Sequence, residues 1–555
     1  MRQANIVIGS ATRSFASWQG SSLPSTPADH ARAAMAPPDR PRADGRVRPG
    51  HDEGRSIRPI MLALLCFLAF TATAMAQPRV LHIGLREDPD LLDPTLGSSY
   101  VGRIVFAGLC DKLFDIDAKL NIVPQLATGY EWQDPTHLII HIRPDVQFQD
   151  GEKLDADAVK YKLMRDLTIK GSMRRGEVNS IESIDIIDPL TVRLNLKAPA
   201  AELLAQLTDR AGIMIAPKAA EAAGDKFGLH PVCAGPFSFD SRVAQDRIVL
   251  KRFPGYWNAK AIHFDEVVYL PHPNSSVRLA NLQAGALDLV EYILPTDVPA
   301  VQKDPNLKVA IDDSLAYEGI TINTDNGSAA KTTLGQDALV RHAFELSLDR
   351  AALIQVVYNG MFTPTAQANP PASPFFFQDV SPPARDVAKA KALLKQAGVT
   401  LPVPVTLTIT NNPDIQQVGE VIQAMAGEAG FDVKLRVTEF ASSLQAGYAG
   451  DFQAYLIGWS GRADPDGNMW QMLHTGGTFN YGHYSNSAVD KALDDARTVA
   501  GIDQRRAFYA KVWAQERQDL PLVYLWTAKN IVGMKKTLTG FEQVPDGLIR
   551  LQGIQ

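Results

Sequence analysis

The chain has little cysteine and no excess of basic residues, and each absence excludes a class of protein. Three Cys occur among 555 residues, far fewer than a small disulfide-rich scaffold carries. Residues 77–555 hold 46 Lys and Arg against 56 Asp and Glu, a net charge of −10. No run of Lys or Arg indicates binding to nucleic acid or to anionic lipid, so we expect neither as a partner.

Catalytic and metal-binding motifs are also missing. The sequence has no G-x-x-x-x-G-K-[ST] phosphate-binding loop and no zinc-type spacing among its 11 His. Residues 458–462, GWSGR, begin like a nucleophile elbow, but G-x-S-x-G requires its second glycine at position 462. We therefore expect a protein that is not an enzyme and that has no metal or cofactor, with a hydrolase as the weaker alternative.

The one long hydrophobic run lies near the N-terminus. Residues 61–76, MLALLCFLAFTATAMA, follow two arginines and end in an A-x-A pattern. A basic start, a short apolar core and such an ending are typical of a cleavable signal peptide. We expect residues 55–76 to be this signal, which predicts secretion of a chain that starts at Gln77. A membrane anchor is the alternative.

Residues 1–54 precede this signal and are rich in Ala, Arg, Pro and Ser, a composition that indicates disorder. A leader of this length is unusual before a signal peptide. We hypothesise that the start site is assigned too early and that translation begins nearer the apolar run. A peptide covering Ser14 to Arg32 in the unprocessed precursor would contradict this hypothesis.

The rest of the chain alternates strand-like and helical patterns. Apolar alternation and turn residues predict strands over 80–85, 137–142, 403–410 and 431–440, hairpins over 183–197 and 237–253, and helices over 101–114 and 415–430. The length predicts more than one domain, and the βαβ style predicts the α/β class.

One segment carries most of the functional information. In RPDVQFQDGEKLDADAVKYKL, residues 143–163, Asp150-Gly151 predicts a turn and Asp155 predicts a helix N-cap. By itself this is only a strand, a turn and a helix. The same run of residues closely resembles the signature of the family 5 solute-binding proteins. The members of this family are the extracytoplasmic receptors of ABC importers for peptides, nickel chelates and related solutes.

Nine further segments resemble that family in the expected order, so the resemblance runs from about Val80 to the C-terminus. They are residues 85–117, 121–132, 231–239, 247–257, 278–291, 340–360, 390–398, 458–468 and 521–526.

The resemblance implies a bilobal α/β fold of the periplasmic-binding-protein type, class II, in its large peptide-binding form. Lobe 1 would combine residues 77–120, 231–316 and 526–555. An extra domain would be inserted at 121–230, and lobe 2 would occupy 317–525. Two segments, 312–317 and 525–532, look like crossings between the lobes.

The resemblance also implies a function. We expect a monomeric periplasmic receptor that captures a peptide or peptide-like molecule by hinge closure. It would deliver this ligand to a permease driven by ATPase subunits. A nickel-chelate receptor, an opine-type or glutathione-type receptor, and a sensor or chaperone on the same fold remain alternatives.

Two cysteines remain once the signal peptide is removed with Cys66. Cys110 and Cys233 form an even pair in an oxidising compartment, and the family places both in one domain. We expect a disulfide bond between them, with two buried thiols as the alternative.

The resemblance places the ligand site in residues 458–468. Trp459 would give an aromatic wall, and Ser460 and the backbone at Gly461 would supply hydrogen bonds. Trp459 as a core residue of lobe 2 is the alternative. Dipeptide-binding relatives resemble GWTGD, with an Asp that pairs with the ligand's α-amino group, whereas this chain has Arg462 at that position.

This departure leaves two interpretations open. In the first, Asp464 or Asp466 pairs with the α-amino group of the ligand. In the second, Arg462 binds a carboxylate of the ligand. Arg462 as a surface residue or as a partner of Asp464 is a third. Further candidates from the resemblance are Ser99, Tyr100, Tyr317, Asn369 and Tyr481.

Overall fold

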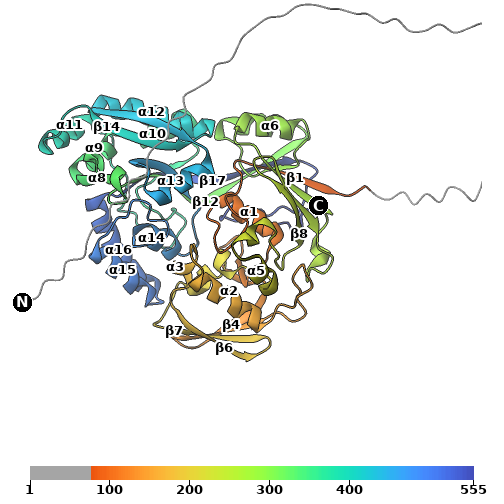
Figure 1. The fold of residues 1–555 in the computed structure, drawn as a ribbon. Helices are drawn as coiled ribbons and strands as arrows, with labels where there is room; N and C mark the ends of the chain where they lie inside the picture. Colours follow the sequence, from red (N-terminus) through yellow and green to blue (C-terminus); the bar gives the residue numbers. More distant parts are fainter. Residues whose placement is uncertain (1–76) are drawn as a thin grey trace, which may run out of the picture. The chain divides into compact units, whose positions relative to one another are not determined.

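The computed structural model describes residues 77–555, and eleven of their strands form one large mixed sheet (Figure 1). The strand order is β15-β14-β16-β12-β17-β11-β1-β10-β9-β8, and β13 pairs with β17. The bounds are β1 Val80–Leu85, β8 Phe237–Val243, β9 Arg247–Arg252, β10 Glu266–Pro271, β11 Leu289–Val290, β12 Leu307–Ile322, β13 Thr363–Pro364, β14 Val403–Thr410, β15 Phe431–Thr438, β16 Ala454–Trp459 and β17 Leu522–Lys535.

The two longest of these strands, β12 and β17, form an antiparallel pair in the middle of the sheet. β11 pairs with the end of β17 near Lys535, and β16 pairs with the end of β12 near Ile322. Both predicted crossing segments, 312–317 and 525–532, lie within this pair. The register of the pair shifts inside the first segment. Two long strands therefore connect the sheet's two halves.

Alternate residues of β1 are apolar and buried, which is the pattern expected of a strand in a sheet. β1 pairs in parallel with β10 and β11, and its side chains Leu81, Ile83 and Leu85 are fully buried. The helix predicted over 101–114 ends earlier, because Cys110 adopts an extended conformation. The helices of this region are α1 Tyr100–Leu109, α6 Ser275–Gln283 and α7 Val298–Lys303.

In the other half, β14, α12 and β15 form a parallel βαβ unit. α12 ends as predicted at Gly430, whose φ of 106° suits a residue without a Cβ. The helices here are α8 Thr333–Gln336, α9 Ala338–Ser347, α10 Arg350–Tyr358, α11 Val387–Gln396, α12 Pro413–Ala429, α13 Phe440–Ala449, α14 Asp466–Leu473, α15 Ser487–Arg497 and α16 Ile502–Asp519.

Residues 113–234 have a hydrophobic core of their own around a four-stranded antiparallel sheet, seen at the lower edge of Figure 1. The Asp155 side chain accepts a hydrogen bond from the Ala158 amide at 3.1 Å, so the predicted N-cap of α2 is confirmed. The elements are β2 Phe114–Ile116, β3 Ile122–Pro124, β4 Ala127–Asp134, β5 His137–Ile142, β6 Ile181–Asp188, β7 Thr191–Leu196, α2 Ala156–Thr168, α3 Arg175–Val178, α4 Leu203–Gln206 and α5 Pro217–Ala223.

This core coincides closely with the insertion expected at 121–230. Residues 77–555 nevertheless form one compact unit, so the division into two lobes and an inserted domain stays a prediction.

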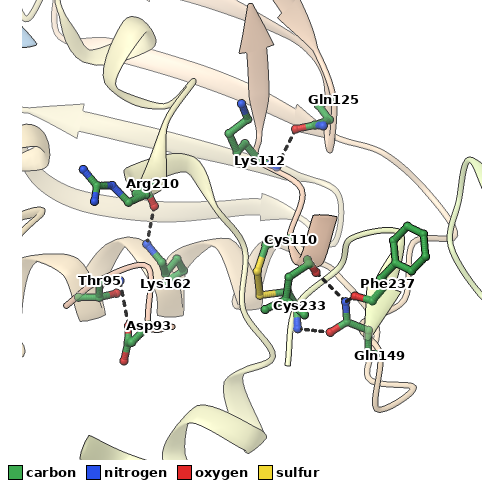
Figure 2. The surroundings of a disulfide bond; sticks show 11 residues. Asp93, Thr95, Cys110, Lys112, Gln125, Gln149, Lys162, Arg210, Cys233 and Phe237 are labelled. Atoms are coloured by element: carbon green, nitrogen blue, oxygen red, sulfur yellow. Dashed lines mark hydrogen bonds between the residues drawn. A yellow bond between two sulfur atoms is a disulfide. The ribbon is translucent and has the colours of Figure 1, made fainter. Parts of the chain in front are cut away.

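Figure 2 shows a disulfide bond between Cys110, directly after α1, and Cys233, with the two sulfur atoms 2.03 Å apart. Gln149 ties the same two segments together. Its side-chain amide donates to the carbonyls of Leu109 and Phe237, and its side-chain oxygen accepts from the amide of Cys233 at 2.6 Å. The bond joins residues 123 positions apart.

Within residues 77–555, no helix is both long enough and apolar enough to cross a membrane. The predicted leader, 1–54, and the predicted signal peptide, 55–76, lie outside the described residues.

Candidate functional site

A cavity of about 220 Å³ lies where the carboxyl ends of several strands meet. Arg86 and Glu87 follow β1, Asn412 follows β14, and Trp459 ends β16, and all four line the cavity. In α/β sheets, ligands bind in the crevice outside the carboxyl ends of strands. The fold therefore assembles a candidate binding site from segments that are far apart in sequence.

Part of the cavity wall is aromatic. The half-buried ring of Trp459 lies 5.0 Å from that of Phe479, which in turn lies 6.4 Å from Tyr481. The Trp459 indole donates a hydrogen bond to Asn468 at 3.1 Å, which fixes the ring's orientation. Rigid rings bury a large area at small entropic cost, so this wall suits an organic ligand.

A bidentate ion pair holds Arg86 at the cavity. Its Nε and Nη2 donate to the two carboxylate oxygens of Glu291 at 2.9 and 3.3 Å. The guanidinium also lies over the rings of Tyr292, at 4.3 Å, and Tyr100, at 5.6 Å. The Glu291 side chain is only 1% exposed. Arg86 is thus fixed in place and its charge is matched within the protein.

Three carboxyl groups that line the cavity, those of Glu87, Glu318 and Asp414, have no ion-pair partner within residues 77–555, whereas a fourth, that of Asp546, pairs with Arg550. Burial raises the pKa of Glu87 and that of Glu318 to about 8, and Arg86 offsets only part of this effect. Burial also raises the pKa of Asp414. Carboxyl groups in this state respond strongly to the charge of a bound molecule.

The position of Glu318 depends on a neighbouring glycine. Glu318 of β12 lies opposite Gly458 of β16. A Cβ at position 458 would lie 2.7 Å from the Glu318 Oε2 atom. The missing side chain at Gly458 therefore leaves the space that this carboxyl group occupies.

An ion-pair cluster lies beside the cavity. The carboxylate of Asp209 is 2.7 Å from Nε of Arg462 and 2.7 Å from Nη2 of Arg103. Burial alone would raise the pKa of Asp209, but these two arginines hold it well below its usual range. Arg462 also lies over the Trp459 ring at 4.5 Å. The cluster joins α1, the 113–234 core and the segment after β16.

The overall likeness to known proteins is consistent with this geometry. A model of the bacterial extracellular solute-binding proteins, family 5, matches residues 121–480, well over half of the chain. The chain belongs to this family. The family predicted from the sequence motifs is therefore confirmed, and with it the predicted function as a solute-binding receptor of the ABC-importer type.

Family 5 relatives of known specificity are similar along nearly the whole described chain. The glutathione-binding protein GsiB of Pectobacterium atrosepticum is 27% identical over 485 residues, 83% of this chain and 91% of the relative. GsiB of Salmonella paratyphi A is 28% identical over 475 residues, 82% of this chain and 90% of the relative. Both relatives are binding proteins rather than enzymes.

Solved structures support the predicted fold. AgaA from A. tumefaciens R10, in complex with agropinic acid, has a TM-score of 0.79 and 26% identity over 86% of this chain and 98% of its own. The periplasmic binding protein DppA from Helicobacter pylori, in complex with the peptide STSA, has a TM-score of 0.77 and 25% identity over 86% and 97%. The α/β periplasmic-binding-protein fold is therefore confirmed.

Six of the ten residues predicted to bind ligand line the cavity of this family 5 protein, namely Ser99, Tyr100, Tyr317, Trp459, Ser460 and Tyr481. Some of these residues also form hydrogen bonds within the protein. Ser99 caps α1 by accepting from the Gly102 amide, and the hydroxyl of Tyr100 donates to the Gly547 carbonyl at 2.8 Å.

Gly461 and Arg462 do not line the cavity. Gly461 has a φ of 74°, and a Cβ there would lie 2.1 Å from the Leu315 carbonyl oxygen, so the residue permits a close approach of two backbones. Arg462 is buried against Asp209 rather than exposed to ligand. The interpretation of Arg462 as a surface residue is wrong, because its side chain is 8% exposed.

Asp464 and Asn369 also lie outside the lining. Asp464 forms a bidentate pair with Arg505 at 2.6 and 2.7 Å, so the alternative that it pairs with Arg462 is wrong. Asn369 is fully buried and accepts from Asn468 at 3.3 Å. Because protein groups already occupy these polar atoms, the site proposed below is built without them.

Sequence reasoning missed the acidic part of the lining, in particular Glu87 and Asp414. The available signal was position, since Glu87 comes two residues after β1 and Asp414 lies in the first turn of the helix after β14. β1 and β14 lie in opposite halves of the sheet and run in opposite directions, so the carboxyl ends of both strands point toward the middle of the β12–β17 pair. Within residues 77–555, no group of three or more His, Cys, Asp or Glu is placed to hold a metal ion.

Proposed function

We propose that this family 5 protein is a periplasmic receptor that captures a peptide or peptide-like molecule and delivers it to the permease of an ABC importer. The main support is the cavity, which combines an aromatic wall with charged groups of both signs at the carboxyl ends of strands. The names of the relatives, with glutathione and a peptide as ligands, agree with this ligand class.

Hinge closure is the proposed mechanism. The cavity is lined both by residues of the predicted lobe 1, such as Arg86, and by residues of the predicted lobe 2, such as Trp459. A ligand that contacts both sides binds the closed form better and shifts the equilibrium toward it. The paired strands β12 and β17 would carry the hinge, and the Asp209–Arg462 ion pair would help to hold the closed form.

The remaining parts of the proposal follow from the family. The protein acts as a non-catalytic monomer without cofactor or metal, and ATPase subunits drive the permease that receives its ligand. Residues 55–76 direct secretion to the periplasm and are then removed.

A second candidate is an opine-type receptor, which the likeness to AgaA favours at 26% identity. The likeness to the nickel-chelate receptor NikA of Staphylococcus aureus, at 20% identity, concerns the fold alone.

A thermal-shift panel tests the proposal. Purified protein is melted with glutathione, with a set of di- and tripeptides, with agropinic acid and with a nickel–histidine chelate. We expect at least one peptide-like compound to raise the melting temperature. A shift by agropinic acid alone would select the second candidate, and a shift by the chelate alone would contradict both.

A further inference from the structure

Three of the seven charged residues that line the cavity form ion pairs within the protein. Arg86 pairs with Glu291, and two other charged lining residues also have partners. Lys529 lies 2.7 Å from Asp313, and Asp546 lies 2.9 Å from Arg550. These three paired residues therefore need no charged group of the ligand to balance them.

The remaining charges of the lining are unbalanced. Glu87, Glu318 and Asp414 have no ion-pair partner in the described part of the chain. Against them stands Arg278, whose guanidinium donates to the carbonyls of His272 and Pro273 rather than to a carboxylate. The three carboxyl groups also lie near one another, since Asp414 raises the pKa of Glu87 and that of Glu318 further. The lining therefore carries more acidic than basic groups without an ion-pair partner.

Two buried phenols lie at the same place. Tyr292 is 8% exposed and Tyr358 is 1% exposed, and both line the cavity. Neither hydroxyl forms a hydrogen bond with another residue of the described chain, residues 77–555. Burial and the nearby Asp414 carboxylate raise the pKa of both hydroxyls. Because a buried phenol normally has a hydrogen-bond partner, these hydroxyls are available to a ligand.

Aromatic ring faces complete the surroundings. The ring of Tyr358 lies 4.6 Å from Phe362 and 5.2 Å from Trp526, and all three line the cavity. The face of an aromatic ring carries partial negative charge and attracts a cation, most strongly when water is excluded.

We infer that Glu87, Glu318, Asp414, Tyr292 and Tyr358 form a cation pocket that binds an ammonium or guanidinium group of the ligand. The carboxylates supply charge and accept N–H bonds, the phenol oxygens accept further N–H bonds, and the rings cover the cation. The inference rests on the proposed function and narrows it, because the receptor then selects peptide-like solutes with a positively charged nitrogen.

Matched probe pairs test the cation pocket by isothermal titration calorimetry at pH 8.5. In each pair, one member carries a positive charge on a group that is neutral in the other member. Alanyl-arginine is compared with alanyl-citrulline, which tests a side-chain guanidinium, and glutathione is compared with N-acetylglutathione, which tests the α-ammonium group. We expect the cationic member of at least one pair to bind at least about tenfold more tightly, the size that charge-assisted hydrogen bonds predict.

Variants locate the effect. Glu87→Gln, Glu318→Gln and Asp414→Asn keep side-chain size and remove charge, so each should reduce the preference for the cationic member by several-fold. Glu420→Gln, an exposed position on the same helix as Asp414, should leave the preference unchanged. Melting curves check folding, and the unaltered protein's own preference decides the question for any variant that does not fold.

The outcomes separate this inference from the proposed function. Equal binding within both pairs would overturn the cation pocket and leave the peptide receptor intact. A charge preference that survives in all three variants would also overturn it. If no member of either pair and no other peptide-like compound binds, the proposed function fails and the inference fails with it.

Discussion

The guanidinium of Arg462 and the carboxylate of Asp209 lie 2.7 Å apart, although 253 positions of sequence separate the two residues. Arg103 contacts the same carboxylate. The position that seemed diagnostic of ligand class is thus part of an internal contact between distant segments. This relationship changes what Arg462 is expected to do.

We predict that Asp209→Asn destabilises the protein, because it leaves two buried arginines without their anion. Removing one partner of a buried ion pair costs about 3–5 kcal/mol. Urea unfolding measures the loss. Arg247→Ala, which breaks an exposed pair with Asp246, is the control and should cost below about 1 kcal/mol. Equal effects of the two changes would contradict the structural role of Asp209.

Arg462→Ala should also lower the stability of the protein. It should weaken the binding of acidic and of neutral probes to the same extent. A selective loss of acidic probes, seen by calorimetry, would instead restore the hypothesis that Arg462 binds a ligand carboxylate.

Trp459→Ala should weaken ligand binding by at least about 1 kcal/mol, because part of the aromatic wall is lost. Its fluorescence should also change when ligand is added to the unaltered protein. Trp132→Ala, at an exposed position on β4, is the matched control and should bind normally. If Trp459→Ala folds and binds normally, Trp459 is a core residue that happens to border the cavity.

The pH dependence of stability tests the raised pKa of Glu318. Its pKa of about 8 in the folded protein is above the ordinary 4.5, so the folded state holds the proton more tightly. The free energy of unfolding from this group is therefore highest at low pH and falls as the pH rises from about 4.5 to 8. Glu318→Gln should remove this fall. Between pH 5 and pH 8, the free energy of unfolding of the variant should therefore rise relative to that of the unaltered protein.

Urea titrations at several pH values measure this difference, with Glu420→Gln expected to follow the unaltered protein. A Glu318→Gln variant that becomes relatively less stable toward pH 8 would show that the carboxyl group is ionised without cost in the empty cavity.

The disulfide between Cys110 and Cys233 predicts that alkylation of the denatured, unreduced protein labels neither cysteine. Reduction should expose both and lower stability by about 2–5 kcal/mol, because the bond constrains a long loop of the unfolded chain. Two labelled thiols without reduction would contradict the bond.

The regular elements were predictable because their patterns are local. The hairpin at 183–197 turns after Asp188 as its Asp-Pro pair indicates, and α12 ends at Gly430 because a left-handed residue is required there. The helix after Tyr100 was predicted too long, because the extended conformation of Cys110 depends on contacts with residues more than a hundred positions away.

The site was predictable only in part. Trp459 and Tyr317 face the cavity where the motifs suggested, because neighbouring strands β12 and β16 place them in register. Arg462 could not be assigned from sequence, since its partner Asp209 comes from a distant segment. Glu87 and Asp414 carry no motif, and only the sheet topology brings them together.

Native mass spectrometry of protein purified without unfolding tests the central claim most directly, since a tightly bound ligand stays with its receptor through mild purification. We predict one peptide-like molecule per chain, lost on denaturation and restored by adding it back. A bound sugar, lipid or bare metal ion, or an empty protein that no peptide-like compound restores to a one-to-one complex, would contradict a peptide-binding receptor.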